Sequence, residues 1–262
     1  MTQKPMTQTE RLLYLINYLI DEEDELKTLA IPVKDNERKR LLRSLTNVRP
    51  PKPVTSDFLM VQDEYLQEEL REKGIISLED MLPAEPGIYL WQGDITRLSA
   101  DAIVNAANHT LLGCFIPCHG CIDNAIHSAA GVELRLECHH LMEKQKGKEP
   151  TGKAKITKAY HLPCRYILHT VGPIVDGEVT ERDCAQLSDC YHSCLELAAE
   201  YQLKSIAFCC ISTGEFHFPN ETAAQIAIQT VKDYQKKNPN GIEVIFNVFK
   251  DKDYEIYKRL LG

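Results

Sequence analysis

The chain has 262 residues, of which 44% are hydrophobic and 26% are charged, a composition typical of a folded globular protein. Its formal net charge of -8 argues against non-specific nucleic-acid binding, which depends on clustered lysine and arginine side chains. The apolar run at residues 12–20 is too short to span a bilayer and lacks the basic lead-in and cleavage site of a signal peptide. We therefore expect no membrane association and a cytoplasmic location.

The ten cysteines do not suggest a disulfide framework. Disulfide-dense chains are mostly small and exported, whereas this chain is long and carries no export signal. Most of its cysteines also fall within predicted strands and helices, where a free thiol behaves as a small apolar side chain. Reduced thiols are expected.

Residues 1–86 are predicted to form a helical N-terminal extension. Thr7 and Glu10 have the spacing of a capping box ahead of a first helix. Further helices are expected at residues 36–47, which end before a proline-rich stretch, and at residues 56–74, between a serine cap and a glycine terminator. No catalytic constellation is found in this part of the chain.

Residues 87–262 alternate between apolar, β-rich runs and amphipathic helical stretches. The expected strands are 88–92, 102–105, 166–171, 205–211 and 243–249. The expected helices are 123–143, 181–201, 221–236 and 252–261. This alternation predicts an α/β fold with helices on both faces of a largely buried sheet. In such folds, ligands bind at the carboxyl ends of the strands.

The loop after the fourth predicted strand is suited to hold a phosphate. Residues 212–216, Ser-Thr-Gly-Glu-Phe, come shortly before a predicted helix for which Asn220 is a suitable N-cap. Exposed backbone N–H groups that lead into a helix N-terminus favour anions. Neither the Gly-x-x-x-x-Gly-Lys nor the Gly-x-Gly-x-x-Gly nucleotide fingerprint is present.

Five segments resemble the macrodomain family, in that family's order along the chain. They are Gly93-Asp94-Ile95-Thr96, Val104-Asn105-Ala106-Ala107-Asn108, residues 123–131 (DNAIHSAAG), residues 167–173 (ILHTVGP) and Ile211-Ser212-Thr213-Gly214. One such segment would carry little weight, but five in order across residues 87–262 are specific. The resemblance implies a three-layer α/β/α fold that binds ADP-ribose in a cleft above the sheet.

The resemblance also implies which residues contact the ligand. Asp94 would accept a hydrogen bond from the adenine amino group beside Ile95, and Asn108 would contact the distal ribose. Residues 212–216 would wrap the diphosphate. The implied substrate-binding residues are Asp94, Ile95, Asn108, Cys121, Ile122, Asp123, Ser212, Thr213, Gly214, Glu215 and Phe216. Taken singly, Asp94 could equally be a turn residue and Asn108 a loop residue that satisfies backbone groups.

The segment 113–127, GCFIPCHGCIDNAIH, stands where most catalytic macrodomains have a run of glycines. It resembles the signature of a microbial subgroup, the zinc-dependent macrodomains, throughout its length. That resemblance implies one Zn²⁺ per chain, held by Cys114, His119 and Cys121. Thiolate and imidazole groups are preferred zinc ligands, and three of them leave a fourth position open. Spacing alone does not choose Cys114 over Cys118.

Two other interpretations share these residues. Residues 117–121 match the Pro-Cys-x-x-Cys half of the zinc deaminase signature, but the His-x-Glu half is absent from the sequence. Cys118 and Cys121 could instead form a redox-active disulfide beside a helix. The redox interpretation leaves Cys114 and the ribose-side loops unexplained.

The resemblance implies a hydrolase that removes mono-ADP-ribose from acidic side chains of modified proteins and releases free ADP-ribose. Asp123 would position or deprotonate a water molecule, and Asn105 would orient the substrate or the loop. Members of the subgroup often accompany a sirtuin-type transferase and a lipoyl-carrier protein, which suggests a target. The alternative is a non-catalytic ADP-ribose-binding module with a structural zinc, which Cys118 would close as fourth ligand.

Overall fold

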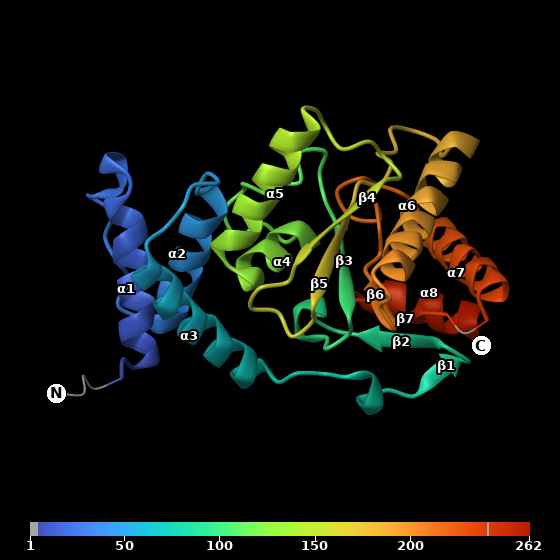
Figure 1. Ribbon diagram of the computed structural model, residues 1–262, viewed down its shortest axis with the longest axis horizontal. Helices are drawn as coiled ribbons and strands as arrows, with labels where there is room; N and C mark the ends of the chain where they lie inside the picture. Colours follow the sequence, from blue (N-terminus) through green and yellow to red (C-terminus); the bar gives the residue numbers. More distant parts are fainter. Residues whose placement is uncertain (1–4, 240) are drawn as a thin grey trace.

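Three helices form the N-terminal extension of the computed structural model, which describes residues 5–239 and 241–262 (Figure 1). They are α1 (Gln8–Asp21), α2 (Asp35–Val48) and α3 (Ser56–Lys73). The predicted capping box of Thr7 and Glu10 is present, whereas α3 is capped by Thr55 rather than by Ser56. The three helices pack around an apolar cluster of their own, separate from the core of the sheet.

A seven-stranded mixed sheet forms the centre of the molecule. Its strands are β1 (Pro83–Glu85), β2 (Ile88–Gln92), β3 (Ala102–Ala106), β4 (Ala154–Lys158), β5 (Tyr166–Thr170), β6 (Ser205–Phe208) and β7 (Glu243–Val248). Their order across the sheet is β1-β2-β7-β6-β3-β5-β4. The five inner strands are parallel, and the edge strands β1 and β4 are antiparallel. The five predicted strands are confirmed, whereas β1 and β4 were missed.

Helices cover both faces of this sheet. They are α4 (Ile122–Ala130), α5 (Val132–Gln145), α6 (Glu181–Glu200), α7 (Asn220–Lys237) and α8 (Asp251–Leu261). Figure 1 shows α4 and α5 on one side of the sheet and α6 and α7 on the other. The predicted three-layer α/β/α architecture is therefore confirmed.

The single helix predicted over residues 123–143 is wrong, because the chain forms two helices there. Gly131 separates α4 from α5 and has a φ of 94°, a left-handed conformation that ends a helix and that glycine adopts at low cost. The helix after β6 also starts differently from the prediction, since Pro219 is its N-cap and Asn220 is its first residue.

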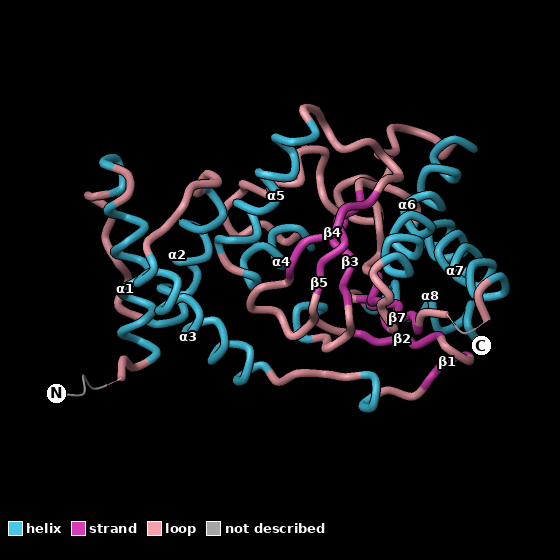
Figure 2. Tube along the Cα trace, in the orientation of Figure 1, coloured by secondary structure: helices cyan, strands magenta, loops and turns pink. Residues whose placement is uncertain are grey.

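The extension lies against the α4 side of the main body (Figure 2). Within it, α2 packs directly on α4. The chain then runs from α3 into β1, which pairs with β2, so the sheet begins slightly before residue 87. Among the described residues, no helix is long and apolar enough to cross a membrane.

Phe58 is the aromatic centre of the extension's apolar cluster, and its side chain is 1% exposed. We expect Phe58→Ala to lower the free energy of unfolding by about 3–5 kcal/mol, because it removes buried apolar area and leaves a cavity. Urea denaturation followed by circular dichroism measures this loss. Met60→Ala on the same helix is the control, since Met60 is 59% exposed. Equal losses in the two variants would contradict the assigned packing.

Candidate active site

The carboxyl ends of the parallel strands bring the predicted ligand loops to one edge of the sheet. The turn after β2 carries Asp94, and the loop after β3 carries Asn108. The loop after β6 carries residues 212–216. Because these strands run in the same direction, their following loops meet on the same side of the molecule.

Asp123 lies at the centre of a buried hydrogen-bond network. Its two carboxylate oxygens accept hydrogen bonds from Asn105 Nδ2 at 2.8 Å and from Asn108 Nδ2 at 3.3 Å. Burial raises the pKa of Asp123 to about 6, while these two amides and the charge of Arg135 act in the opposite direction. Asp123 is 5% exposed, so the residue is almost completely buried. Such a group can exchange a proton near neutral pH.

Asn105 is oriented by a histidine on the neighbouring strand. The register between β3 and β5 places Asn105 opposite His169, and Asn105 Nδ2 donates to His169 Nδ1 at 3.1 Å. Burial lowers the pKa of His169 to about 3, so the ring is neutral. Since Nδ1 accepts a hydrogen bond, the proton is on Nε2, which donates to Thr157 Oγ1 at 2.9 Å. Thr157 therefore fixes the tautomer that Asn105 requires.

His127 is a site residue to which the sequence assigned no role. It lies one turn after Asp123 in α4, and its Nε2 is 3.5 Å from Asp123 Oδ1. The i, i+4 spacing on one helix face was the signal that could have found it. Among the residues that the structure describes, neither buried ring nitrogen has a hydrogen-bond partner, and neither does the buried Asn105 Oδ1. Buried polar atoms are rarely left unpaired, so these atoms point to a ligand or water at this position.

The loop of residues 212–216 presents unpaired backbone donors. Ser212 has a φ of 64°, and among the described residues the N–H groups of Ser212, Gly214 and Phe216 have no hydrogen-bond partner. A Cβ atom at Gly172 would lie 2.0 Å from Ser212 Oγ and 2.8 Å from Ile211 Cγ2, so a larger residue at position 172 would require these side chains to move. The arrangement resembles the anion-binding concavities formed by successive backbone amides.

Asp94 and Ile95 lie at the other end of this edge. Asp94 Oδ1 accepts from the backbone N–H of Thr96 at 3.0 Å and from its hydroxyl at 2.7 Å, and Asp94 Oδ2 lies 3.7 Å from Lys73 Nζ. Ile95 is 2% exposed, so little of its side chain can touch a ligand. Phe249 was predicted as the last residue of a strand. In the structure it follows β7, the neighbour of β2 in the sheet, and its side chain is 74% exposed.

Cys114, His119 and Cys121 converge just before α4. Their sulfur and nitrogen ligand atoms lie within 4.8 Å of one another, and Cys114 Sγ is 3.6 Å from His119 Nδ1. Zinc bonds of roughly 2.0–2.3 Å place neighbouring tetrahedral ligands about 3.5 Å apart, so the donor set fits zinc after a small contraction. Burial raises the pKa of Cys121 to about 12, so this thiol stays protonated without a cation.

The opposite ring nitrogen of His119 faces an acidic side chain. His119 Nε2 is 3.6 Å from Glu215 Oε1. A carboxylate beside the second nitrogen of a metal-binding histidine orients the ring and increases its basicity. Glu215 thus lies where its carboxylate can orient the His119 ring, in addition to its predicted role beside the diphosphate.

Cys118 faces away from these three side chains. Its sulfur lies 3.2 Å from Ser44 Oγ and 3.4 Å from the carbonyl oxygen of Arg40, both on α2. All ten cysteines are free thiols, so Cys118 and Cys121 form no disulfide in this structure. The structure therefore groups Cys114, and not Cys118, with the two other candidate ligands.

Asn108 and Ile122 complete the predicted set. Asn108 Oδ1 accepts hydrogen bonds from the backbone and hydroxyl of Thr110, and Asn108 Nδ2 donates to the carbonyl oxygen of Gly113. The Asn108 amide is thus engaged within its loop. Ile122 is the first residue of α4, where backbone N–H groups have no partner within the helix.

The fold and the loops at its carboxyl edge define a macrodomain, and the chain belongs to this family. The Macro domain family model matches residues 104–227. The chain is 53% identical to a protein-ADP-ribose hydrolase of Treponema medium, over 98% of this chain and 100% of the relative. It is 46% identical to a protein-ADP-ribose hydrolase of Staphylococcus aureus (strain MSSA476), over 95% of this chain and 94% of the relative.

Solved macrodomains share the fold. A Trypanosoma brucei macrodomain in complex with ADP-ribose matches with a TM-score of 0.66 and 30% identity, over 84% of this chain and 95% of that chain. A mutant Oceanobacillus iheyensis macrodomain with ADPR matches with a TM-score of 0.61 and 39% identity, over 66% of this chain and 91% of that chain.

Thr157→Val tests the role of Thr157 as hydrogen-bond partner of His169. The substitution keeps the side-chain shape but leaves the buried Nε2–H of His169 with Cys138 Sγ, a weak acceptor at 3.9 Å, so we expect a loss of about 1–3 kcal/mol in the free energy of unfolding. Urea denaturation measures this loss. Thr222→Val in α7 is the matched control, since the Thr222 side chain makes no hydrogen bond to any residue that the structure describes. If Thr157→Val and Thr222→Val lower the free energy of unfolding equally, the assigned tautomer of His169 is wrong.

Proposed function

We propose that this protein is a zinc-dependent hydrolase that removes mono-ADP-ribose from aspartate and glutamate side chains of modified proteins. The hydrolase part is supported by the 53% and 46% identity to protein-ADP-ribose hydrolases over nearly the whole chain. The zinc part is supported by the convergence of Cys114, His119 and Cys121. The last of these residues, Cys121, stands two positions before Asp123.

In this proposal, ADP-ribose lies along the carboxyl edge of the sheet. Asp94 accepts a hydrogen bond from the adenine amino group, and the free N–H groups of residues 212–216 bind the diphosphate. The distal ribose then lies near the loop of Cys121 and the N-terminus of α4. The positive end of this helix dipole adds to the attraction for the anionic ligand.

Cys114, His119 and Cys121 would hold the zinc ion. When bound, zinc supplies a Lewis acid next to the distal ribose, with a coordination position open for substrate or water. Asp123 accepts a proton from the attacking water, and its raised pKa of about 6 keeps that proton transferable near neutral pH. Asn105 holds the Asp123 carboxylate at 2.8 Å and keeps it oriented. Asn105 is thus a positioning residue in this mechanism.

The proposed partner is a mono-ADP-ribosylated protein, with a lipoyl-carrier protein modified by a sirtuin-type transferase as the suggested target, and free ADP-ribose is the product. The proposal includes a cytoplasmic location, because a reducing compartment keeps the ligand thiols of Cys114 and Cys121 from oxidising. Neither a nucleic acid nor a membrane is part of it.

A binding module with a structural zinc is the second candidate. A structural zinc site is usually closed by four protein ligands, and Cys118 is the available fourth thiol. The contacts of Cys118 with Ser44 and Arg40 on α2 favour the enzyme instead, since they keep its sulfur away from the other three ligands.

Substitution of the three cysteines separates these alternatives. We expect Cys114→Ser and Cys121→Ser to lose zinc and most hydrolysis of an aspartyl-ADP-ribosylated protein, because each removes a thiolate ligand. Cys118→Ser should keep zinc near one per chain and most of the activity. Metal analysis beside a release assay for ADP-ribose measures both quantities. Loss of zinc from Cys118→Ser would favour the closed, structural site, and full hydrolysis by metal-free protein would exclude a catalytic metal.

Two aspartates should differ in the step they affect. Asp94→Ala should weaken ADP-ribose binding by about 1.5–3 kcal/mol, because it removes a charge-assisted hydrogen bond to the adenine amino group. Asp123→Asn should lower turnover by at least about 100-fold while affinity changes only a few-fold, since it removes the proton acceptor. Calorimetry and single-turnover assays separate the two effects. Parallel losses of binding and turnover in Asp123→Asn would leave its catalytic role unsupported.

A further inference from the structure

One face of α2 carries four polar contacts to the main body. Arg40, Arg43, Ser44 and Asn47 stand at i, i+3, i+4 and i+7, so they form one stripe along the helix. The side chains of Arg43, Ser44 and Asn47 make hydrogen bonds to the loop of residues 113–121 or to α4, and the backbone carbonyl of Arg40 accepts one from Cys118 Sγ. From sequence, such a stripe is typical of a solvated helix face. In this structure it faces the loop that carries the candidate zinc ligands.

Arg43 joins that loop to the first turn of α4. Its Nη2 donates to the carbonyl oxygen of His119 at 3.1 Å and to Asn124 Oδ1 at 2.6 Å, and its Nε donates to Asn124 Oδ1 at 3.0 Å. Asn124 in turn donates from Nδ2 to the carbonyl oxygen of Ile116 at 3.0 Å. The guanidinium group of Arg43 thus bonds the loop directly at His119 and, through Asn124, at Ile116.

Asn47 holds the middle of the same loop. Its side chain is 1% exposed; Oδ1 accepts from the backbone N–H of Cys118 at 2.9 Å, and Nδ2 donates to Ser128 Oγ at 3.0 Å. Cys118 has a φ of 51°, a left-handed conformation that is uncommon for a residue with a side chain. Asn47 therefore stabilises a backbone turn that the sequence of the loop itself disfavours.

The loop has few hydrogen bonds of its own. Within residues 114–120, the only backbone pair that the structure records is His119 N–H to the carbonyl oxygen of Ile116, at 3.2 Å. Phe115 and Ile116 are 40% and 58% exposed, so little apolar packing holds the segment. A segment with so few internal contacts needs support from outside to keep three ligands in a fixed geometry.

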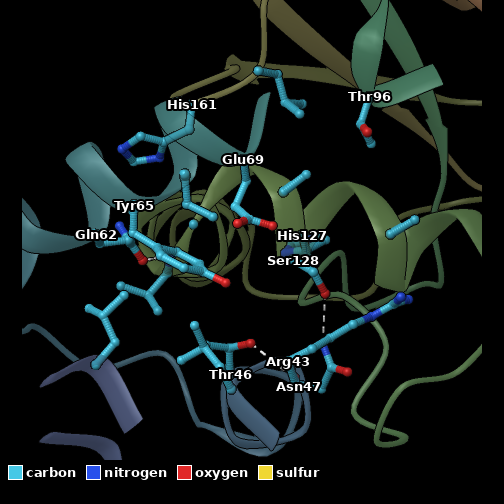
Figure 3. A pocket seen from close by; sticks show the side chains of 18 of the residues that line it. Arg43, Thr46, Asn47, Gln62, Tyr65, Glu69, Thr96, His127, Ser128 and His161 are labelled. Carbon is cyan, nitrogen blue, oxygen red and sulfur yellow. Dashed lines mark hydrogen bonds between the residues drawn. The ribbon is translucent and has the colours of Figure 1, made fainter. Parts of the chain in front are cut away.

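Arg135 bonds the C-terminal end of α2, close to Asn47, to the main body. Its Nη1 donates to the carbonyl oxygens of Thr46 and Arg49 at the C-terminus of α2, and its Nε donates to the carbonyl oxygen of Leu112 just before the loop. Arg43 and Asn47 are among the residues that line a cavity of about 230 Å³, and Figure 3 shows the hydrogen bond from Asn47 to Ser128 of α4. The extension and the loop are therefore joined by polar contacts and do not simply pack together.

We infer that Arg43 and Asn47 of the N-terminal extension are positioning residues for the metal centre, which hold residues 113–121 in the conformation that brings Cys114, His119 and Cys121 together. The inference rests on the proposed zinc site. Outer contacts of this kind set metal affinity because they limit the motion of the ligands, and their removal typically costs 10-fold to 100-fold in affinity.

The test compares single variants of the full chain. In Arg43→Gln and Asn47→Ala, we expect zinc to dissociate to a chromogenic chelator about 10-fold to 100-fold faster than from the wild type. Amide hydrogen exchange of residues 114–120 should also accelerate, while exchange in the strands stays unchanged. Arg43→Lys should give an intermediate rate, because one ammonium group cannot replace the forked donors of arginine.

Arg71→Gln is the matched control, since the Arg71 side chain is 70% exposed on α3 and pairs with Glu68 of the same helix. Wild-type rates of zinc release and of loop exchange in Arg43→Gln and Asn47→Ala would overturn the inference. Acceleration in every segment of the chain would also overturn it, because that result indicates general destabilisation. If the wild type holds no zinc, the zinc part of the proposed function fails, and the exchange of residues 114–120 still decides whether α2 holds the loop.

Discussion

The parallel register of β3 and β5 is the constraint on which the candidate site depends. It places Asn105 directly opposite His169, so that one amide group bonds both the imidazole ring and the Asp123 carboxylate. A shift of one residue would turn Asn105 to the other face of the sheet, because side chains alternate along a strand. The orientation of the Asp123 carboxylate thus follows from backbone pairing several residues away, while its raised pKa comes from burial.

The start of α4 connects this network to the candidate metal ligands. Cys121 is the N-cap of the helix, and its sulfur accepts the backbone N–H of Asn124 at 3.4 Å. Two residues later Asp123 points toward β3, and one turn further His127 lies beside it. A single helix start therefore brings a thiol ligand and a proton acceptor together, and displacement of either one moves the other.

The N-terminal extension contacts both ends of the proposed ligand cleft. Lys73 at the end of α3 lies near Asp94, and α2 bonds the loop that carries Cys114, His119 and Cys121. Its apolar residues pack in their own cluster with Phe58, which Val132 of α5 also contacts, while Arg43 and Asn47 of α2 make hydrogen bonds to the macrodomain. The extension is in this sense part of the site, although residues 1–86 contain none of the proposed ligand-binding or metal-binding residues.

The sequence by itself determined the family and the order of the inner strands and helices along the chain, because these depend on local periodicity and on short motifs. The strand Ile88–Gln92 was predicted to the residue. Edge strand β4 was missed, since its identity depends on pairing with β5. Spacing alone left Cys114 and Cys118 open as ligands, and the family resemblance implied Cys114. The tertiary structure groups Cys114 with His119 and Cys121, because the Cys118 sulfur contacts α2 instead. The tertiary structure also decided that the polar face of α2 contacts the loop of residues 113–121, because the sequence of a helix does not show which surface packs against it.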